Sequence, residues 1–71
     1  MFTLEVVIRT PHSLKALKIV GGLAYTGGNH TRQGGIDEYV FEGDEATLTE
    51  ALRRLEVLPE AVCVLREVVE D

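Results

Sequence analysis

Apolar and polar side chains alternate along residues 2–9, the first regular stretch of the chain. A period of two is typical of a half-buried β-strand. Residues 36–42 and 61–69 also have strand composition, and the second of these is apolar on both faces. A shorter polar candidate lies at 29–33, and Gly34-Gly35 after it is suited to a tight turn into the next strand. The expected inward side chains of the first strand are Phe2, Leu4, Val6 and Ile8.

The clearest helical pattern follows Asp44 and ends before Pro59. Its apolar residues recur at spacings of three and four, which predicts one buried stripe on a helix. Either Asp44 caps this helix, or Thr47 opens a capping box with Glu50. The stripe consists of Leu48, Ala51, Leu52 and Leu55.

An earlier helix is predicted from Pro11 to about Tyr25, with Thr10 as its N-cap and Pro11 at its first position. Its inward residues are expected to be Leu14 and Leu17. The pair Gly21-Gly22 interrupts the pattern, because glycine is costly inside a helix. Either the helix stops at Val20, or small residues are needed there for close packing and the longer helix ends at the stop signal Gly27-Gly28.

The order strand, helix, weak strand, strand, helix, strand predicts an α+β fold of the ferredoxin-like βαββαβ kind. It places two helices on one face of a four-stranded antiparallel sheet. The other face keeps Val7, two apolar residues of the strand at 36–42 and about half of the last strand's apolar residues. An uncovered apolar surface usually marks an interaction site. We therefore expect a homodimer or higher oligomer, formed by sheet-face or strand-edge contact.

Length and charge narrow the class of protein. The chain has 71 residues, which suits one domain over 1–71, and Cys63 is its single cysteine, so no internal disulfide forms. The formal net charge is −5, with 12 acidic and 7 basic side chains. This balance disfavours binding to nucleic acid or to an anionic membrane surface. There is no long apolar run and no secretory signal, so the expected location is the cytoplasm.

Three segments of the chain resemble the ACT family of regulatory domains. They are residues 9–17 around the first strand–helix turn, residues 22–30 with a Gly-Asn step, and residues 39–68 with a leucine-spaced helix between two strands. The Lrp-like effector-binding domains and other ferredoxin-like oligomers stay open as related folds. The resemblance implies a stand-alone regulatory module that holds an amino-acid-like ligand at a subunit interface. By position, the implied ligand-binding residues are Thr10, Pro11, His12, Ser13, Asn29 and His30, with His12 standing where the family usually has glycine.

Other chemistry has weaker support in the sequence. His12, His30 and Cys63 are metal-ligand residue types, but their spacing matches no compact metal motif, so a metal sensor would need to bridge subunits. The glycine pairs of residues 27–35, together with Arg32, suit either an anion site or a flexible hairpin loop. No nucleophile–base pair is apparent, so we expect no enzyme and no cofactor. An assembly subunit without a small ligand is the main alternative function.

Overall fold

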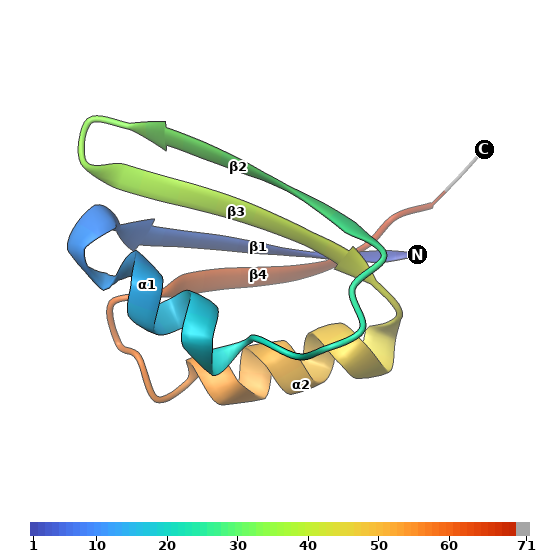
Figure 1. The fold of residues 1–71 in the computed structure, drawn as a ribbon. Coiled ribbons are helices and arrows are strands. Elements are labelled where there is room, and N and C mark those ends of the chain that lie inside the picture. Colours follow the sequence, from blue (N-terminus) through green and yellow to red (C-terminus); the bar gives the residue numbers. More distant parts are fainter. Residues whose placement is uncertain (70–71) are drawn as a thin grey trace.

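The computed structural model describes residues 1–69 and contains six regular elements (Figure 1). Their order is the predicted strand, helix, strand, strand, helix, strand. No helix in this described part of the chain has the length and apolar character needed to cross a bilayer. The elements are β1 (Phe2–Arg9), α1 (Thr10–Ile19), β2 (Gly27–Gln33), β3 (Ile36–Gly43), α2 (Glu45–Leu55) and β4 (Val62–Glu67).

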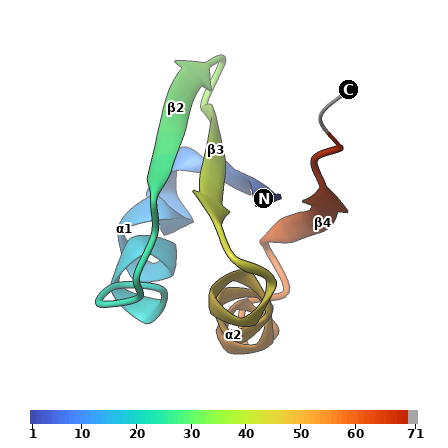
Figure 2. The same cartoon turned by 90° about the vertical axis from the view of Figure 1, so that its right-hand side faces the viewer.

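The four strands form one sheet in the order β2-β3-β1-β4, and every neighbouring pair is antiparallel. Figures 1 and 2 show both helices on the same face of this sheet. The predicted ferredoxin-like α+β architecture is therefore confirmed. β1 lies in the centre, where Leu4 is paired with Phe41 of β3 and Leu65 of β4.

The hydrophobic core lies between β1 and α2. Leu4, Val6 and Ile8 are at most 1% exposed, as the alternation of the first strand predicts. From α2, the predicted stripe faces them, with Leu48, Ala51 and Leu55 buried and Leu52 half-buried. Asp44 is the N-cap of α2, and its carboxylate accepts the backbone N–H of Thr47 at 2.8 Å. Of the two predicted caps, Asp44 is the one that forms.

The first helix is shorter than predicted. α1 ends at Ile19 rather than near Tyr25, and Gly22 follows in the left-handed region with φ +82°. Glycine tolerates this conformation, so the chain leaves the helix there. The predicted N-cap is also wrong, because Thr10 is the first helical residue and Arg9 occupies the cap position without a side-chain bond. Within the described residues, the buried Oγ1 of Thr10 has no hydrogen-bond partner.

The buried face of α1 also differs from the prediction. Leu14 is 65% exposed and Leu17 is 38% exposed. The buried face is instead Ser13, Ala16 and Val20, at spacings of three and four. These side chains are smaller than leucine, so the helix axis can lie closer to the sheet, and Ser13 is held inward by a hydrogen bond to β3. A polar bond and small volume thus decide the rotation of this helix, instead of its largest apolar residues.

The β2–β3 hairpin has the predicted turn. Gly34 and Gly35 have φ +60° and +77°, and positive φ at both central residues is what a two-residue type I′ turn requires. β2 starts two residues earlier than predicted, so Gly27-Gly28 belongs to a strand and is not a helix stop. A Cβ at Gly28 would lie 2.8 Å from the carbonyl oxygen of Val40, which excludes a larger residue at that strand position.

Two substitutions test the observed rotation of α1. Ala16→Leu overfills the helix–sheet contact, so we expect it to lower the free energy of unfolding by about 1–3 kcal/mol. Leu14→Ala removes an exposed side chain and changes that free energy by less than about 0.5 kcal/mol. Urea unfolding followed by circular dichroism measures both. A costly Leu14→Ala with a neutral Ala16→Leu would instead support the face expected from the apolar spacing.

Candidate functional site

A fully buried carboxylate, that of Asp37 in β3, binds polar side chains from two other elements, α1 and β2. Asp37 belongs to β3 and is 0% exposed. Arg32 donates to it twice, from Nε to Oδ1 at 2.5 Å and from Nη2 to Oδ2 at 3.1 Å. The hydroxyl of Ser13 in α1 donates to Oδ2, and Nε2 of His30 in β2 lies 3.2 Å from Oδ1. We call these four residues the Asp37 cluster.

The sheet register explains why the Asp37 cluster forms. β2 runs antiparallel to β3, with Arg32 opposite Asp37 and His30 opposite Tyr39. Side chains alternate between the two faces of a strand, so His30 and Arg32 both point to the helix side. The His30 ring stacks on Tyr39, with centroids 4.3 Å apart and an interplanar angle of 8°. The pairing of β2 with β3 thereby brings His30 to the carboxylate that also binds Ser13 of α1.

Charge in the Asp37 cluster is balanced locally. Hydrogen bonding to Arg32 is the main reason that the pKa of Asp37 lies well below its ordinary value. Burial opposes this shift, and the bonds from Ser13 and His30 add to it. The same contact raises the pKa of Arg32 above its ordinary value. Asp37 is therefore an ionised carboxylate with hydrogen bonds to both oxygens, as a buried charge requires.

The Asp37 cluster contains serine, histidine and aspartate, but its geometry differs from that of a catalytic triad. In a triad, histidine lies between the nucleophile and the carboxylate and takes the nucleophile's proton. Here the hydroxyl of Ser13 donates directly to Asp37, and His30 bonds to the same carboxylate. Ser13 therefore has no histidine at its oxygen in this arrangement, and the low pKa of Asp37, caused mainly by Arg32, makes that carboxylate a weak acceptor for the serine proton. The contacts instead join α1 to the β2–β3 hairpin.

The structure brings together only part of the predicted ligand site. Ser13 and His30 meet through Asp37, while Asn29 follows the alternation to the opposite face of β2 and accepts the backbone N–H of His30. Thr10 and Pro11 are in the first turn of α1, and His12 is half-buried in the next position. The amino-acid-like ligand stays a prediction.

Sequence reasoning missed Asp37 and Tyr39 and assigned Arg32 a different role. The guanidinium expected to attract an anion from solution is bound to the chain's own carboxylate. A signal was present, because Asp37 alternates in phase with the aromatic residues Tyr39 and Phe41 and so shares their face of the strand. A charge at a core position requires a partner of opposite charge or a set of donors.

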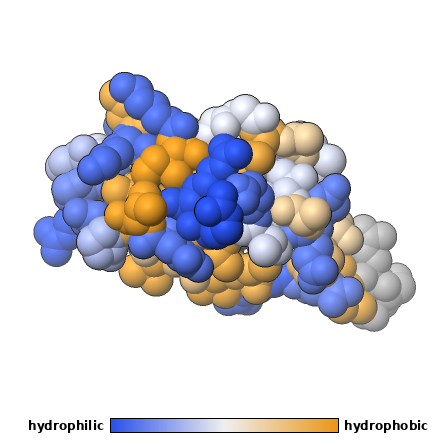
Figure 3. All heavy atoms as spheres, turned by 90° about the horizontal axis from the view of Figure 1, so that it is seen from below, coloured by the Kyte–Doolittle hydropathy of each residue, from blue (hydrophilic) through white to orange (hydrophobic). Residues whose placement is uncertain are grey.

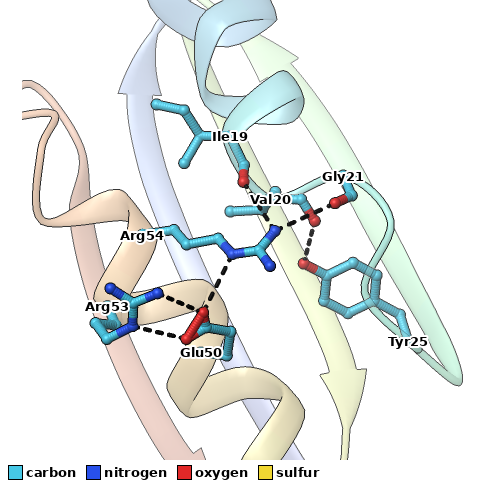
Figure 4. A network of polar contacts seen from close by, with 7 residues as sticks. All are labelled: Ile19, Val20, Gly21, Tyr25, Glu50, Arg53 and Arg54. Atoms are coloured by element: carbon cyan, nitrogen blue, oxygen red, sulfur yellow. Dashed lines mark hydrogen bonds and ion pairs between the residues drawn. The ribbon is translucent and has the colours of Figure 1, made fainter.

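A second polar network joins α2 to the end of α1 (Figure 4). Glu50 accepts two bonds from Arg53 and one from Arg54 at 3.2 Å, which includes the predicted Glu50–Arg54 pair. Arg53 is the main reason that the pKa of Glu50 falls to about 2. Arg54 also donates to the carbonyl oxygens of Ile19 and Gly21, each at 3.4 Å. The negative end of the α1 dipole lies at these carbonyls and stabilises the positive charge of Arg54.

Metal-ligand residue types do not gather in the described residues, which contain no group of three or more His, Cys, Asp or Glu side chains arranged for an ion. Cys63 lies on the helix side of β4 and is half-buried. Burial raises the pKa of its thiol.

The sheet face opposite the helices carries apolar side chains that no described element covers. Val7 in β1 and Val62 in β4 are direct neighbours in the register. In the helix-side view, hydrophobic and hydrophilic surface are interspersed (Figure 3). We call the side of the sheet opposite the helices the open face. Its exposed apolar residues are Val7 (38%), Ile36 (39%), Val62 (63%) and Val64 (43%).

Fold and register define the class: a ferredoxin-like α+β domain with an internally neutralised carboxylate and an uncovered sheet face. No protein-family model matches the chain, and no curated protein matches it either.

Acid unfolding tests the role of Asp37. Its pKa in the folded state is lowered, so the unfolded chain takes up the proton first as the pH falls. The stabilisation is fully present above about pH 5 and is lost progressively below about pH 4. We expect Asp37→Asn to be less stable than wild type at pH 6 and to lose less further stability between pH 5 and pH 2. Urea midpoints across this range measure the difference, and parallel pH profiles would contradict it.

Proposed function

We propose that this chain is a homo-oligomeric interaction module that associates through its open face. The single observation behind the proposal is the set of exposed apolar side chains on that face. Both helices lie on the other side of the sheet, so nothing in the described chain covers the apolar side chains of the open face. Uncovered apolar surface on a sheet face is characteristic of a protein contact.

The composition of the open face supports contact with protein. The cluster formed by Val7, Val62 and Val64 lies beside an ion pair, in which Nε of Arg66 is 2.9 Å from Glu5. An apolar centre with charged residues around it is the usual anatomy of an interface. A small domain also gains from oligomerisation, because its own core is limited and Cys63 forms no internal disulfide. A second copy of the chain is therefore the partner that the proposal assigns.

A lysine at position 7 tests the proposal. Val7 is opposite Glu38 in the register, so Val7→Lys places a positive charge beside a negative one on the neighbouring strand. Opposite charges in this position are favourable, so we expect the variant monomer to fold. Burying that lysine against a second copy is costly, so we expect the dissociation constant to rise at least about tenfold. Size-exclusion chromatography with light scattering gives the mass as a function of concentration.

The matched control is Val57→Lys, because Val57 is 71% exposed in the loop after α2 and lies outside the open face. We expect it to keep the wild-type mass. A wild-type chain that is monomeric at 100 µM, or an oligomer that Val7→Lys leaves intact, would rule out association through this face.

A further inference from the structure

β4 is an open edge of the sheet. In the order β2-β3-β1-β4 it has one neighbour, and Figure 2 shows no described helix or strand beyond it. The other edge, β2, is made of glycine and polar residues. β4 instead begins with four consecutive apolar residues, Val62 to Leu65. An apolar edge strand exposes unpaired backbone groups to another strand.

The hydrogen-bond pattern shows which backbone groups of β4 point outward. The N–H of Val68 donates to the carbonyl oxygen of Met1 at 2.9 Å. This pair continues the register in which Phe2 is opposite Glu67. Hydrogen-bonded and non-hydrogen-bonded pairs alternate in an antiparallel ladder. It follows that Val62, Val64 and Arg66 bond to β1, while the N–H and C=O groups of Cys63, Leu65 and Glu67 face outward.

The β1–β3 ladder gives the same parity independently. The N–H of Thr10 donates to the carbonyl oxygen of Gly35 at 2.9 Å, one step beyond the pair Arg9 and Ile36. By alternation, even-numbered residues of β1 bond to β3 and odd-numbered ones bond to β4. Glu5 is thus bonded to Val64, as the Val68 contact requires.

We propose that β4 pairs antiparallel with β4 of a second copy, with the two-fold axis at Leu65. In this register Leu65 is opposite the partner's Leu65, and Cys63 is opposite the partner's Glu67. The backbone groups of all three outward-facing residues of one strand then bond to those of the partner strand. The two sheets join into one of eight strands. This interface goes beyond the proposed function, because it uses the strand edge and not the open face.

Competing symmetric registers use fewer of the outward groups. An axis at Glu67 or at Arg66 sets identical charges opposite each other, which is unfavourable. An axis at Cys63 brings Glu67 opposite the partner's Pro59, which has no N–H to donate. An axis at Val64 leaves Glu67 outside the strand pair. With the axis at Leu65, Arg66 is opposite the partner's Val64 and no like charges oppose.

A proline at position 67 tests the edge. The N–H of Glu67 points outward, so Glu67→Pro removes a bond to the second copy and no bond within the chain. Glu67→Ala keeps the N–H and is the matched control. We expect Glu67→Pro to raise the dissociation constant at least about tenfold over Glu67→Ala, with unchanged circular dichroism. Equal masses for the two variants at all concentrations would overturn the edge pairing.

Disulfide trapping tests the register. In a Cys63→Ser background, one chain carries Val64→Cys and another carries Arg66→Cys. These positions form a non-hydrogen-bonded pair in the proposed register, where Cβ atoms are close enough for a disulfide. We expect the equilibrated mixture to oxidise to a covalent dimer several times faster than either chain alone. A mixture no faster than the separate chains would refute an axis at Leu65.

The outcomes separate this inference from the proposed function. If Val7→Lys dissociates the assembly and Glu67→Pro does not, the open face is the interface and the edge pairing is wrong. If only Glu67→Pro dissociates it, the edge pairing holds and the open face does not carry association. A wild-type chain that is monomeric at 100 µM contradicts both.

Discussion

The buried carboxylate of Asp37 constrains the structure more than any other single group. It is fully enclosed, yet it is charged, so it needs donors on both oxygens. Those donors come from α1 and from β2, which are separated in sequence by residues 20–26. Removing one of them leaves a buried charge underbonded, and this is why the position of the helix and that of the hairpin depend on each other.

This constraint also accounts for the shape of the helix layer. Ser13 must face the sheet to reach Asp37, and Ala16 and Val20 then follow it inward. The larger Leu14 and Leu17 are turned toward solvent as a consequence. At the other end of α1, Arg54 of α2 holds the last carbonyls, so a short helix without a side-chain N-cap is fixed at both ends by tertiary contacts. Most helical stability in proteins has this tertiary origin.

Local patterns were sufficient for much of the fold. The alternation in β1, the stripe on α2, the cap at Asp44 and the Gly34-Gly35 turn follow from residues near one another in sequence. The failures involve distant partners. The rotation of α1 depends on the hydrogen bond between Ser13 and Asp37, which are 24 residues apart. The spacing of apolar residues predicts that Leu14 and Leu17 face inward, because it contains no information about a hydrogen bond to a distant residue. For the candidate site, Ser13 and His30 were identified, but their shared partner was not, because the register of β2 on β3 decides which side chains meet.

The sheet has two surfaces that the described chain leaves without a partner: the apolar side chains of the open face and the backbone groups at the β4 edge. Strands of six to eight residues spaced about 4.8 Å apart give a face of roughly 25 Å by 19 Å. A standard interface buries about 800 Å² on each partner, which is more than the projected area of such a face. Pairing at the edge doubles the face, because it joins two sheets without covering either side. The two contacts therefore do not compete: the edge satisfies backbone groups, and the enlarged apolar face is left to associate by side-chain burial.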